Sequence, residues 1–416
     1  MGLLAFPEAR TLATLNRDGR LLFASRVTRM LAYGLVSVVL VLYLVQVGLT
    51  EREVGLLLSL TLAGDAVVSL WITTNADRIG RRRMLLAGAG LLVAAGLVFA
   101  TSGSIVLLTL AAVIGTISPS GNEVGPCQSI EQAALPQTAP NDYRTSLFAW
   151  YNLAGYLATA AGALVGGATA QALQAAGWLP LDSYRAIIVV YGLLGLALAA
   201  LFAQLSPDVE AAHLSRPGSG SIGPARAGGR LGLHRSRGVV FRLAGLFMVD
   251  SFAGGLVVQS LIAYWFHVRF GVAPGALGVI FFGANLFAGV SALAAARVAA
   301  RIGLVNTMVF THLPSNVFLI LVPLMPTLPL AIVMLLLRFS VSQMDVPTRQ
   351  SYITAVVDPD ERSSAMGLTT IARTLASSFA PAITGALLSA SLLSVPFFVA
   401  APTSTLQHGG RNAVSC

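Results

Sequence analysis

Five acidic and five arginine side chains stand out inside long apolar runs of the sequence, where a charge can do chemistry that an exposed charge cannot. On insertion scales, placing one charge in a bilayer costs about 2.5–3.5 kcal/mol, so each is expected to have a partner or a role. A buried carboxylate can take up a proton, and a buried guanidinium can bind an anion. The acids are Asp65, Glu123, Glu131, Asp250 and Asp345, and the bases are Arg26, Arg29, Arg338, Arg349 and Arg373.

The spacing of these residues predicts how they group. Arg338, Asp345 and Arg349 are separated by seven and four positions, so they should share one helical face. An acid four residues before a base is a favourable pair, which predicts contact between Asp345 and Arg349. Glu123 and Glu131 share a face of another run, and we expect Glu131 to face Arg349. Either these ions only hold the bundle together, or their pairs also open and close a path.

Single residues suggest further roles. Asp65 is a candidate for protonation, with a hydrogen-bonded packing role as the alternative. Asp250 lies in a separate apolar run and belongs to the same candidate pathway. Arg29 and Arg373 are candidates for binding an anionic ligand. Arg26 lies near the end of its run, and we expect its side chain to extend to the membrane surface.

The elements that position these residues are transmembrane helices. The chain has 416 residues, of which 56% are hydrophobic and 10% are charged, too little polar surface to coat a soluble globule. A membrane-spanning helix needs about 20 apolar residues. The predicted spans are 21–47, 53–76, 84–101, 105–135, 145–174, 184–205, 239–267, 274–299, 303–325, 328–357 and 364–393.

The basic residues set the orientation and exclude several classes of protein. All 26 are arginines; with the N-terminus inside, 17 fall in inner segments and 3 at outer ends. Arginine enrichment on the cytoplasmic side predicts a cytoplasmic N-terminus, and it explains the net charge of +9 without nucleic acid. The chain has neither a lysine for a Schiff base nor a Walker A loop nor metal-binding spacing. We therefore expect no enzyme activity, cofactor or metal.

A basic turn at 77–83 joins the second and third predicted spans and reads Asp-Arg-Ile-Gly-Arg-Arg-Arg. It resembles the loop between helices 2 and 3 of the major facilitator superfamily, which contains Asp-Arg-x-Gly-Arg-Lys. The resemblance implies an all-α membrane fold of two pseudo-symmetric six-helix halves that work by alternating access. It also implies a conformational latch, whose expected members are Asp77, Arg78, Gly80, Arg81, Arg82, Arg144 and Arg362.

Repeated residues support two halves. Gly55 and Gly278 lie 223 positions apart, and Gly167 and Gly385 lie 218 apart, as other matching residues do. The predicted domains are a cytoplasmic segment 1–20, a six-helix half 21–205, a cytoplasmic linker 206–238, a second half 239–400 and a polar tail 401–416. The last apolar run stops early, so the second half should hold five helices and a stub in place of a full twelfth helix.

Two weaker elements are similar to those of drug:proton antiporters, at 162–167 and 380–385. With this resemblance, we predict a monomeric, proton-coupled secondary transporter that exports a small organic solute across a bacterial-type inner membrane. Its expected partners are the solute, protons and the lipid bilayer. Organic-anion uptake or exchange is the alternative favoured by Arg29, Arg349 and Arg373. A membrane scaffold or sensor without transport is the alternative favoured by the shortened C-terminal end.

Overall fold

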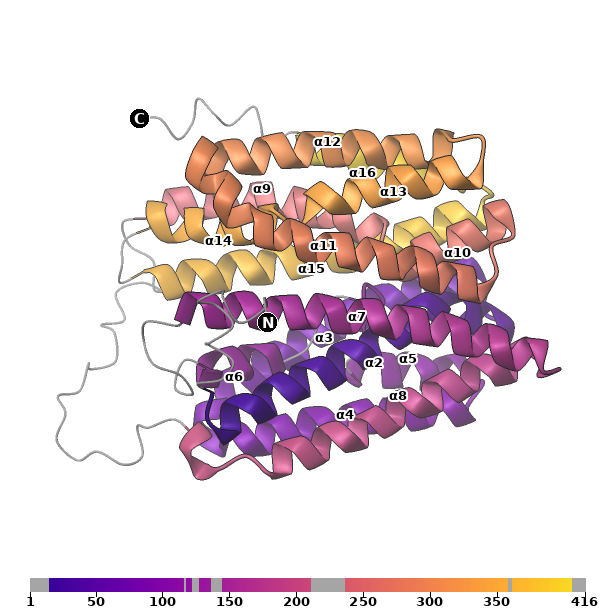
Figure 1. Ribbon diagram of the computed structural model, residues 1–416, viewed down its shortest axis with the longest axis horizontal. Coiled ribbons are helices and arrows are strands. Elements are labelled where there is room, and N and C mark those ends of the chain that lie inside the picture. The colour runs from indigo at the N-terminus through magenta and orange to yellow at the C-terminus, as the bar shows by residue number, and fades with distance from the viewer. Residues whose placement is uncertain are drawn as a thin grey trace, which may run out of the picture. The chain divides into compact units, whose positions relative to one another are not determined.

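The computed structural model describes residues 15–115, 117–121, 127–135, 144–210, 236–357 and 361–405, and these ranges contain helices and turns but no strand (Figure 1). Nine helices within them are long and apolar enough to cross a membrane, which confirms the predicted all-α membrane fold. The helices are α2 (Arg17–Val47), α3 (Glu51–Ile79), α4 (Arg81–Thr101), α5 (Ile105–Ile114), α6 (Cys127–Ala134), α7 (Arg144–Ala175), α8 (Pro180–Ala203), α9 (Arg237–Leu256), α10 (Gln259–Phe270), α11 (Pro274–Ile302), α12 (Leu304–Leu324), α13 (Leu328–Ser342), α14 (Asp345–Val356), α15 (Arg362–Ser389) and α16 (Val395–Thr405).

Single glycines make the tightest turns between helices. Gly80 alone separates α3 from α4 and has a φ of 111°, and Gly303 alone separates α11 from α12 with a φ of 85°. This left-handed backbone region costs glycine little and strains other residues. The two turns lie 223 positions apart, the offset that the repeat predicts.

Three predicted spans are each broken into two helices. The prediction of one continuous helix was wrong for 105–135, which contains α5 and α6, for 239–267, which contains α9 and α10, and for 328–357, which contains α13 and α14. Pro347 lacks the N–H that would bind the carbonyl of Gln343, so α13 ends at Ser342 and α14 begins at Asp345. The second of these spans is interrupted at Val257 and Val258, shortly after Gly254 and Gly255, which have low helix propensity. Arg338 and Asp345 therefore lie on different helices.

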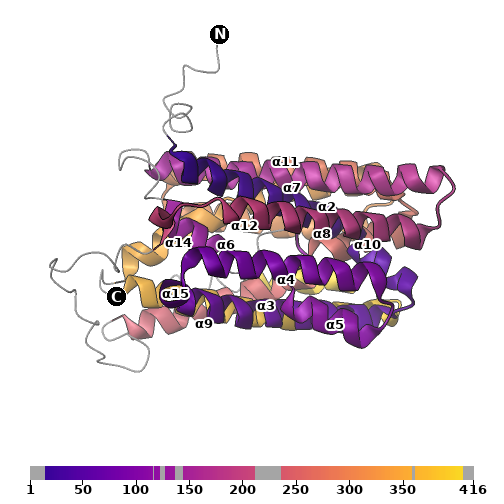
Figure 2. The same cartoon turned by 90° about the horizontal axis from the view of Figure 1, so that it is seen from below.

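The chain forms two compact units that exchange segments relative to the predicted halves. Unit 1 lies within Met1–Leu49, Gly64–Ser215 and Gln259–Leu286, and unit 2 within Thr50–Ala63, Arg216–Val258 and Phe287–Cys416. In unit 1, α2 packs along α7 and α8, and α4 packs along α8 (Figure 2). In unit 2, α9 packs along α15, and α12 packs along α13. The predicted stub is the 11-residue α16, which packs on α9 and α12.

Paired glycines bring helices from the two sequence halves into contact within each unit. In unit 1, a Cβ on Gly278 of α11 would lie 3.2 Å from the Cα of Gly167 of α7. In unit 2, a Cβ on Gly55 of α3 would lie 2.7 Å from the Cα of Gly385 of α15. The repeat pairs Gly55 with Gly278 and Gly167 with Gly385, so the two contacts are equivalent, as expected of a repeated fold.

Adding one methyl group at Gly55 is expected to destabilise the protein, by about 1–3 kcal/mol for an overpacked site. The new Cβ would meet backbone atoms, the oxygen of Pro381 at 2.5 Å and the Cα of Gly385 at 2.7 Å. Gly245→Ala is the matched control, because nothing lies within 4 Å of its Cβ position. Melting temperatures in detergent test this; equal values for Gly55→Ala and Gly245→Ala would contradict the close contact.

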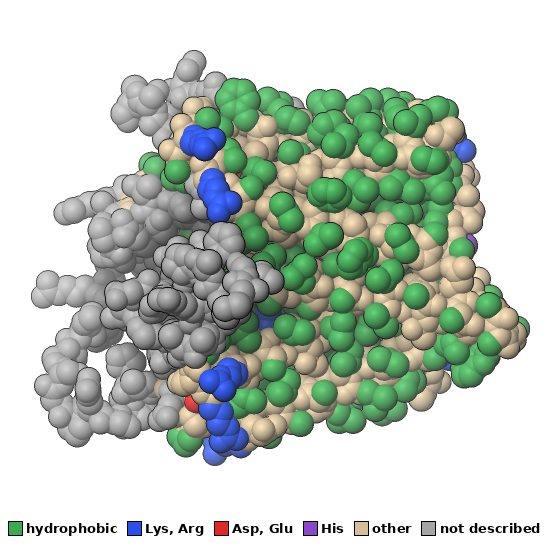
Figure 3. All heavy atoms as spheres, in the orientation of Figure 1, with side chains coloured by type: hydrophobic (Ala, Val, Ile, Leu, Met, Phe, Trp, Pro, Cys, Tyr) green, Lys and Arg blue, Asp and Glu red, His purple; other side chains and the backbone are tan. Residues whose placement is uncertain are grey.

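The helices present apolar side chains outward along their length (Figure 3). Phe379 of α15 is 66% exposed and Phe310 of α12 is 63% exposed. Within unit 1, Arg81, Arg82 and Arg83 form the charged first turn of α4. An apolar surface of this kind is stable only against lipid, and the charged end fits the water interface.

Candidate functional site

A buried ion pair joins Arg29 of α2 to Glu131 of α6 within unit 1. Arg29 donates from Nη1 and Nη2 to the two carboxylate oxygens, each at 2.7 Å. Ser25 donates to Oε1 at 2.7 Å, and the Tyr151 hydroxyl donates to Oε2. The Arg29 and Glu131 side chains are 1% and 0% exposed. Glu131, which we expected to face Arg349, is held by Arg29 through two hydrogen bonds.

Arg26 does not extend to the membrane surface as expected. It is buried, and its guanidinium carbon lies 4.5 Å from the ring centre of Tyr151. Gly155 leaves the room for it, because a Cβ there would lie 2.7 Å from Arg26 Nε. The aromatic face stabilises the cation inside the bundle, so the side chain does not need to reach the interface.

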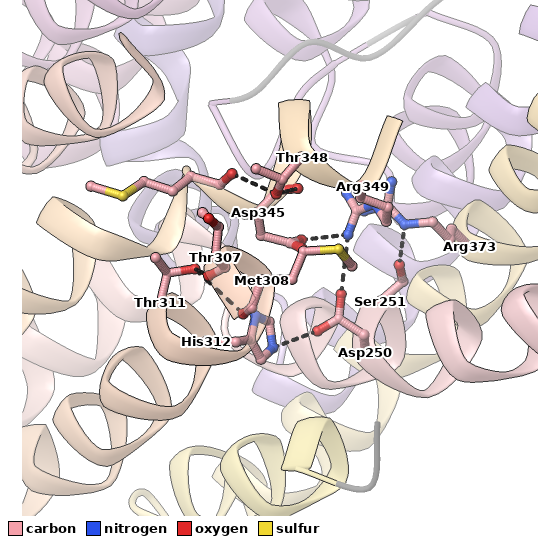
Figure 4. Close-up of polar contacts among 11 residues, drawn as sticks. Asp250, Ser251, Thr307, Met308, Thr311, His312, Asp345, Thr348, Arg349 and Arg373 are labelled. Atoms are coloured by element: carbon pink, nitrogen blue, oxygen red, sulfur yellow. Dashed lines mark hydrogen bonds and ion pairs between the residues drawn. The ribbon is translucent and has the colours of Figure 1, made fainter. Parts of the chain in front are cut away.

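A second polar cluster lies in unit 2 around Asp250 of α9 (Figure 4). His312 Nε2 of α12 lies 2.8 Å from Asp250 Oδ1, and Arg349 Nη1 of α14 lies 3.5 Å from Asp250 Oδ2. Arg349 Nη1 also binds Asp345 Oδ2 at 2.6 Å, which confirms the pair predicted from their four-residue spacing. We call Asp250, His312, Asp345 and Arg349 the Asp250 cluster.

Helix α9 is the platform for this cluster. Phe247, one turn before Asp250, lies under the Arg349 guanidinium, 5.4 Å from ring centre to guanidinium carbon. Ser251, next to Asp250, accepts a hydrogen bond from Arg373 Nε of α15 at 2.9 Å (Figure 4). Because α15 packs along α9, the same face brings a second arginine to the edge of the cluster.

Exposure separates the two clusters. The Arg29–Glu131 pair is sealed and its carboxylate is fully hydrogen-bonded, which fits a structural pair. In the Asp250 cluster the side chains of Asp250 and His312 are 12% and 16% exposed. One carboxylate there has two alternative cationic partners, and one of them is an imidazole, the side chain whose ordinary pKa lies nearest neutral pH. This arrangement can bind a proton and rearrange its ion pairs.

The basic turn is held by an acid that the sequence did not suggest. The Glu210 carboxylate accepts hydrogen bonds from the backbone N–H groups of Arg81 at 2.6 Å and Arg82 at 3.2 Å, the first residues of α4. A carboxylate at a helix N-terminus is stabilised by the free N–H groups and the helix dipole. In addition, the side chain of Arg81 binds the Val209 carbonyl at 3.3 Å.

Other predicted site residues lie apart or outside the description. Asp65 is buried in unit 1, and its Oδ1 lies 3.5 Å from the hydroxyl of Ser69. Glu123 lies outside the described residues. The side chains of four expected latch members also lie outside them: Asp77, Arg78, Arg144 and Arg362. For these residues the predicted roles stay predictions.

The sequence reasoning missed His312, Ser251, Tyr151 and Glu210. His312 carried a usable signal, because it is an ionisable side chain inside the predicted span 303–325. Ser251 and Tyr151 have neutral hydroxyls, which are common in membrane helices and gave no signal before their partners were known.

Comparison with known proteins identifies the family. The family model of the Major Facilitator Superfamily matches residues 22–381 of this chain. The chain belongs to the major facilitator superfamily. It is 33% identical over 398 residues to the uncharacterized membrane protein YJR124C of Saccharomyces cerevisiae, covering 89% of this chain and 88% of that protein.

Solved structures show the same superfamily fold. A D-xylose-proton symporter has a TM-score of 0.74 and 15% identity, with 94% of this chain and 96% of that chain covered. A bacterial homolog of the human lysosomal transporter Spinster, inward-facing and unoccupied, has a TM-score of 0.71 and 17% identity, with 90% of this chain and 82% of that chain covered. The nucleoside transporter NupG has a TM-score of 0.71 and 13% identity, with 96% of this chain and 100% of that chain covered. Family and fold thus point to a multi-pass membrane transporter, and they do not confirm the drug:proton antiporter branch.

Proposed function

We propose that this superfamily member is a proton-coupled secondary transporter that moves a small organic solute by alternating access. The observation that carries the proposal is the Asp250 cluster, in which one partly exposed carboxylate is shared by His312 and Arg349. An ionisable group inside membrane helices is a functional candidate by default, because its cost must be offset by a role. Asp65, Glu123 and Glu131 remain candidates for the same pathway.

Protonation of His312 is the proposed switch. Five charged residues interact electrostatically with the His312 imidazole or with its partner Asp250. They are Asp250 itself on α9, Arg338 on α13, Asp345 and Arg349 on α14, and Arg373 on α15. With His312 protonated, Asp250 is neutralised at 2.8 Å, and Arg349 is left to Asp345 at 2.6 Å. With His312 neutral, Asp250 attracts Arg349 more strongly. One proton therefore moves one guanidinium between two carboxylates, which lie on different helices.

Direction, topology and location are part of the proposal. Export rests on the antiporter-like elements at 162–167 and 380–385 of the sequence. The cytoplasmic N-terminus rests on the arginine distribution. We propose a monomer, because each superfamily chain supplies both halves of an alternating-access fold. A bacterial-type inner membrane stays the sequence prediction for the location. The relative that is 33% identical is a membrane protein of Saccharomyces cerevisiae, a eukaryote.

Transport in vesicles tests this function. A thermal-shift screen of small organic compounds first finds a ligand, because a ligand that binds the folded protein stabilises it, and more so the tighter it binds. We then expect reconstituted protein to move that ligand when a pH gradient is imposed, and reversing the gradient should reverse the net movement. Ligand movement at the same rate with and without the gradient would contradict proton coupling. Stabilising ligands that never cross the membrane would favour the scaffold or sensor.

A further inference from the structure

The ionisable residues of the apolar runs balance over the whole chain but not within unit 2. Of the five acids and five arginines that the sequence singles out, unit 2 holds two acids, Asp250 and Asp345, and three arginines. These arginines are Arg338, Arg349 and Arg373. These five residues together carry one positive charge in excess, and protonation of His312 adds a second. A net charge inside membrane helices is costly until an opposite charge joins it.

The excess charge is located on Arg373 and Arg338. Arg349 is matched by its two carboxylates. Arg373 donates from Nε to Ser251, and across the described residues its two Nη groups bind no acceptor. Among the residues that the structure describes, Arg338 has no hydrogen bond or ion pair, and its Nε is buried without an acceptor. Arg29, the other arginine that the sequence suggested for an anion, is fully occupied by Glu131.

The contact with Ser251 also sets the geometry of Arg373. With Nε pinned on α9, the guanidinium plane is held and the edge with Nη1 and Nη2 is left for a ligand. Two parallel N–H groups on one planar edge match the two oxygens of a carboxylate or a phosphate. A guanidinium that is already oriented loses less conformational entropy when it binds.

We propose that Arg373 anchors an oxyanion of the transported solute, a carboxylate or a phosphate. The inference rests on the proposed transport function and names the substrate class of the same site. It favours the organic-anion alternative over a neutral or cationic solute. A proton on His312 would strengthen the anion's binding, so proton and anion would bind together and move in the same direction. This inference therefore favours the uptake alternative over the export proposed above.

Binding of matched probes to the purified full-length protein tests the inference without any transport step. The probes are benzoate, phenyl phosphate, benzamide and benzylamine, compared by thermal shift at equal concentration and constant ionic strength. We expect benzoate or phenyl phosphate to stabilise the wild-type protein more than the neutral amide and the amine do. Whichever of the two anions stabilises more identifies the group. If neither stabilises more than benzamide, the proposal is overturned.

Variants of Arg373 connect that binding to the site. Arg373→Gln is expected to weaken the apparent affinity for the better anion by about tenfold, the loss of one charge-assisted pair. Arg373→Lys, which keeps the charge without the planar edge, should retain part of the binding and shows that the fold survives. Arg269→Gln, at an exposed arginine near the end of α10, is the control and should bind like wild type. Equal anion binding by Arg373→Gln and wild type would overturn the assignment. Anion binding without gradient-driven movement would instead sink the transport function alone.

Discussion

Replacing Arg29 with Ala is expected to lower the free energy of unfolding by about 3–5 kcal/mol, the usual cost of breaking a buried ion pair from one side. The Glu131 carboxylate would keep the hydrogen bonds from the neutral hydroxyls of Ser25 and Tyr151 but lose its cation, at a position that is 0% exposed. The measurement is the melting temperature of the purified protein in detergent, supported by the yield of folded protein.

Two controls separate the lost pair from a general loss of positive charge. Arg185→Ala breaks a surface pair with Asp182, 3.7 Å apart with side chains 35% and 48% exposed, and should cost about 0–1 kcal/mol. Replacing both Arg29 and Glu131 with Met should recover much of the stability, because no buried charge is then left unpaired. If Arg29→Ala and Arg185→Ala have the same melting temperature, the Arg29–Glu131 pair does not stabilise the fold.

Replacing Asp250 with Asn is expected to reduce pH-gradient-driven transport by more than about tenfold, typical of the loss of a proton-transfer group. Asn has nearly the same shape but carries no charge, so His312 and Arg349 lose the carboxylate that they share. Exchange of labelled for unlabelled solute without a gradient should persist, because it needs no net proton movement.

Asp182→Asn, at an exposed acid in the first turn of α8, should leave both gradient-driven transport and exchange unchanged. Gradient-driven transport by Asp250→Asn at the wild-type rate would remove Asp250 from the coupling mechanism. Loss of exchange together with a lower melting temperature would instead show that Asp250 mainly holds α9, α12 and α14 together.

The sequence predicted those parts of the fold and site that depend on local patterns. Apolar runs located the spans, and their ends lie within a few residues of the helix ends, as for 21–47 against Arg17–Val47. The four-residue spacing of Asp345 and Arg349 predicted a pair that is present at 2.6 Å. Glycines at the repeat offsets predicted two related halves, whereas the close contacts of Gly55 with Gly385 and of Gly167 with Gly278 became known only from the structure.

The misses share a physical reason, which is that they depend on contacts distant in the sequence. Glu131 finds Arg29 from 102 positions away, and no spacing rule distinguishes that arginine from Arg349. The turn at Gly80 is capped by Glu210, which lies beyond four further spans. The break before Asp345 was readable from Pro347, but hydropathy averaged over a long window conceals a single missing N–H. His312 shows that an ionisable residue in an apolar run counts whatever its type.

Proton movement driven by the solute alone tests the central claim most directly. Vesicles containing the protein and a pH-sensitive dye receive a gradient of the identified solute with no pH gradient imposed, and His312→Gln is compared with wild type. We predict that wild type moves protons as the solute moves, while His312→Gln moves the solute without a pH change. An equal pH change with His312→Gln, or none with wild type while solute crosses, would contradict proton coupling through the Asp250 cluster.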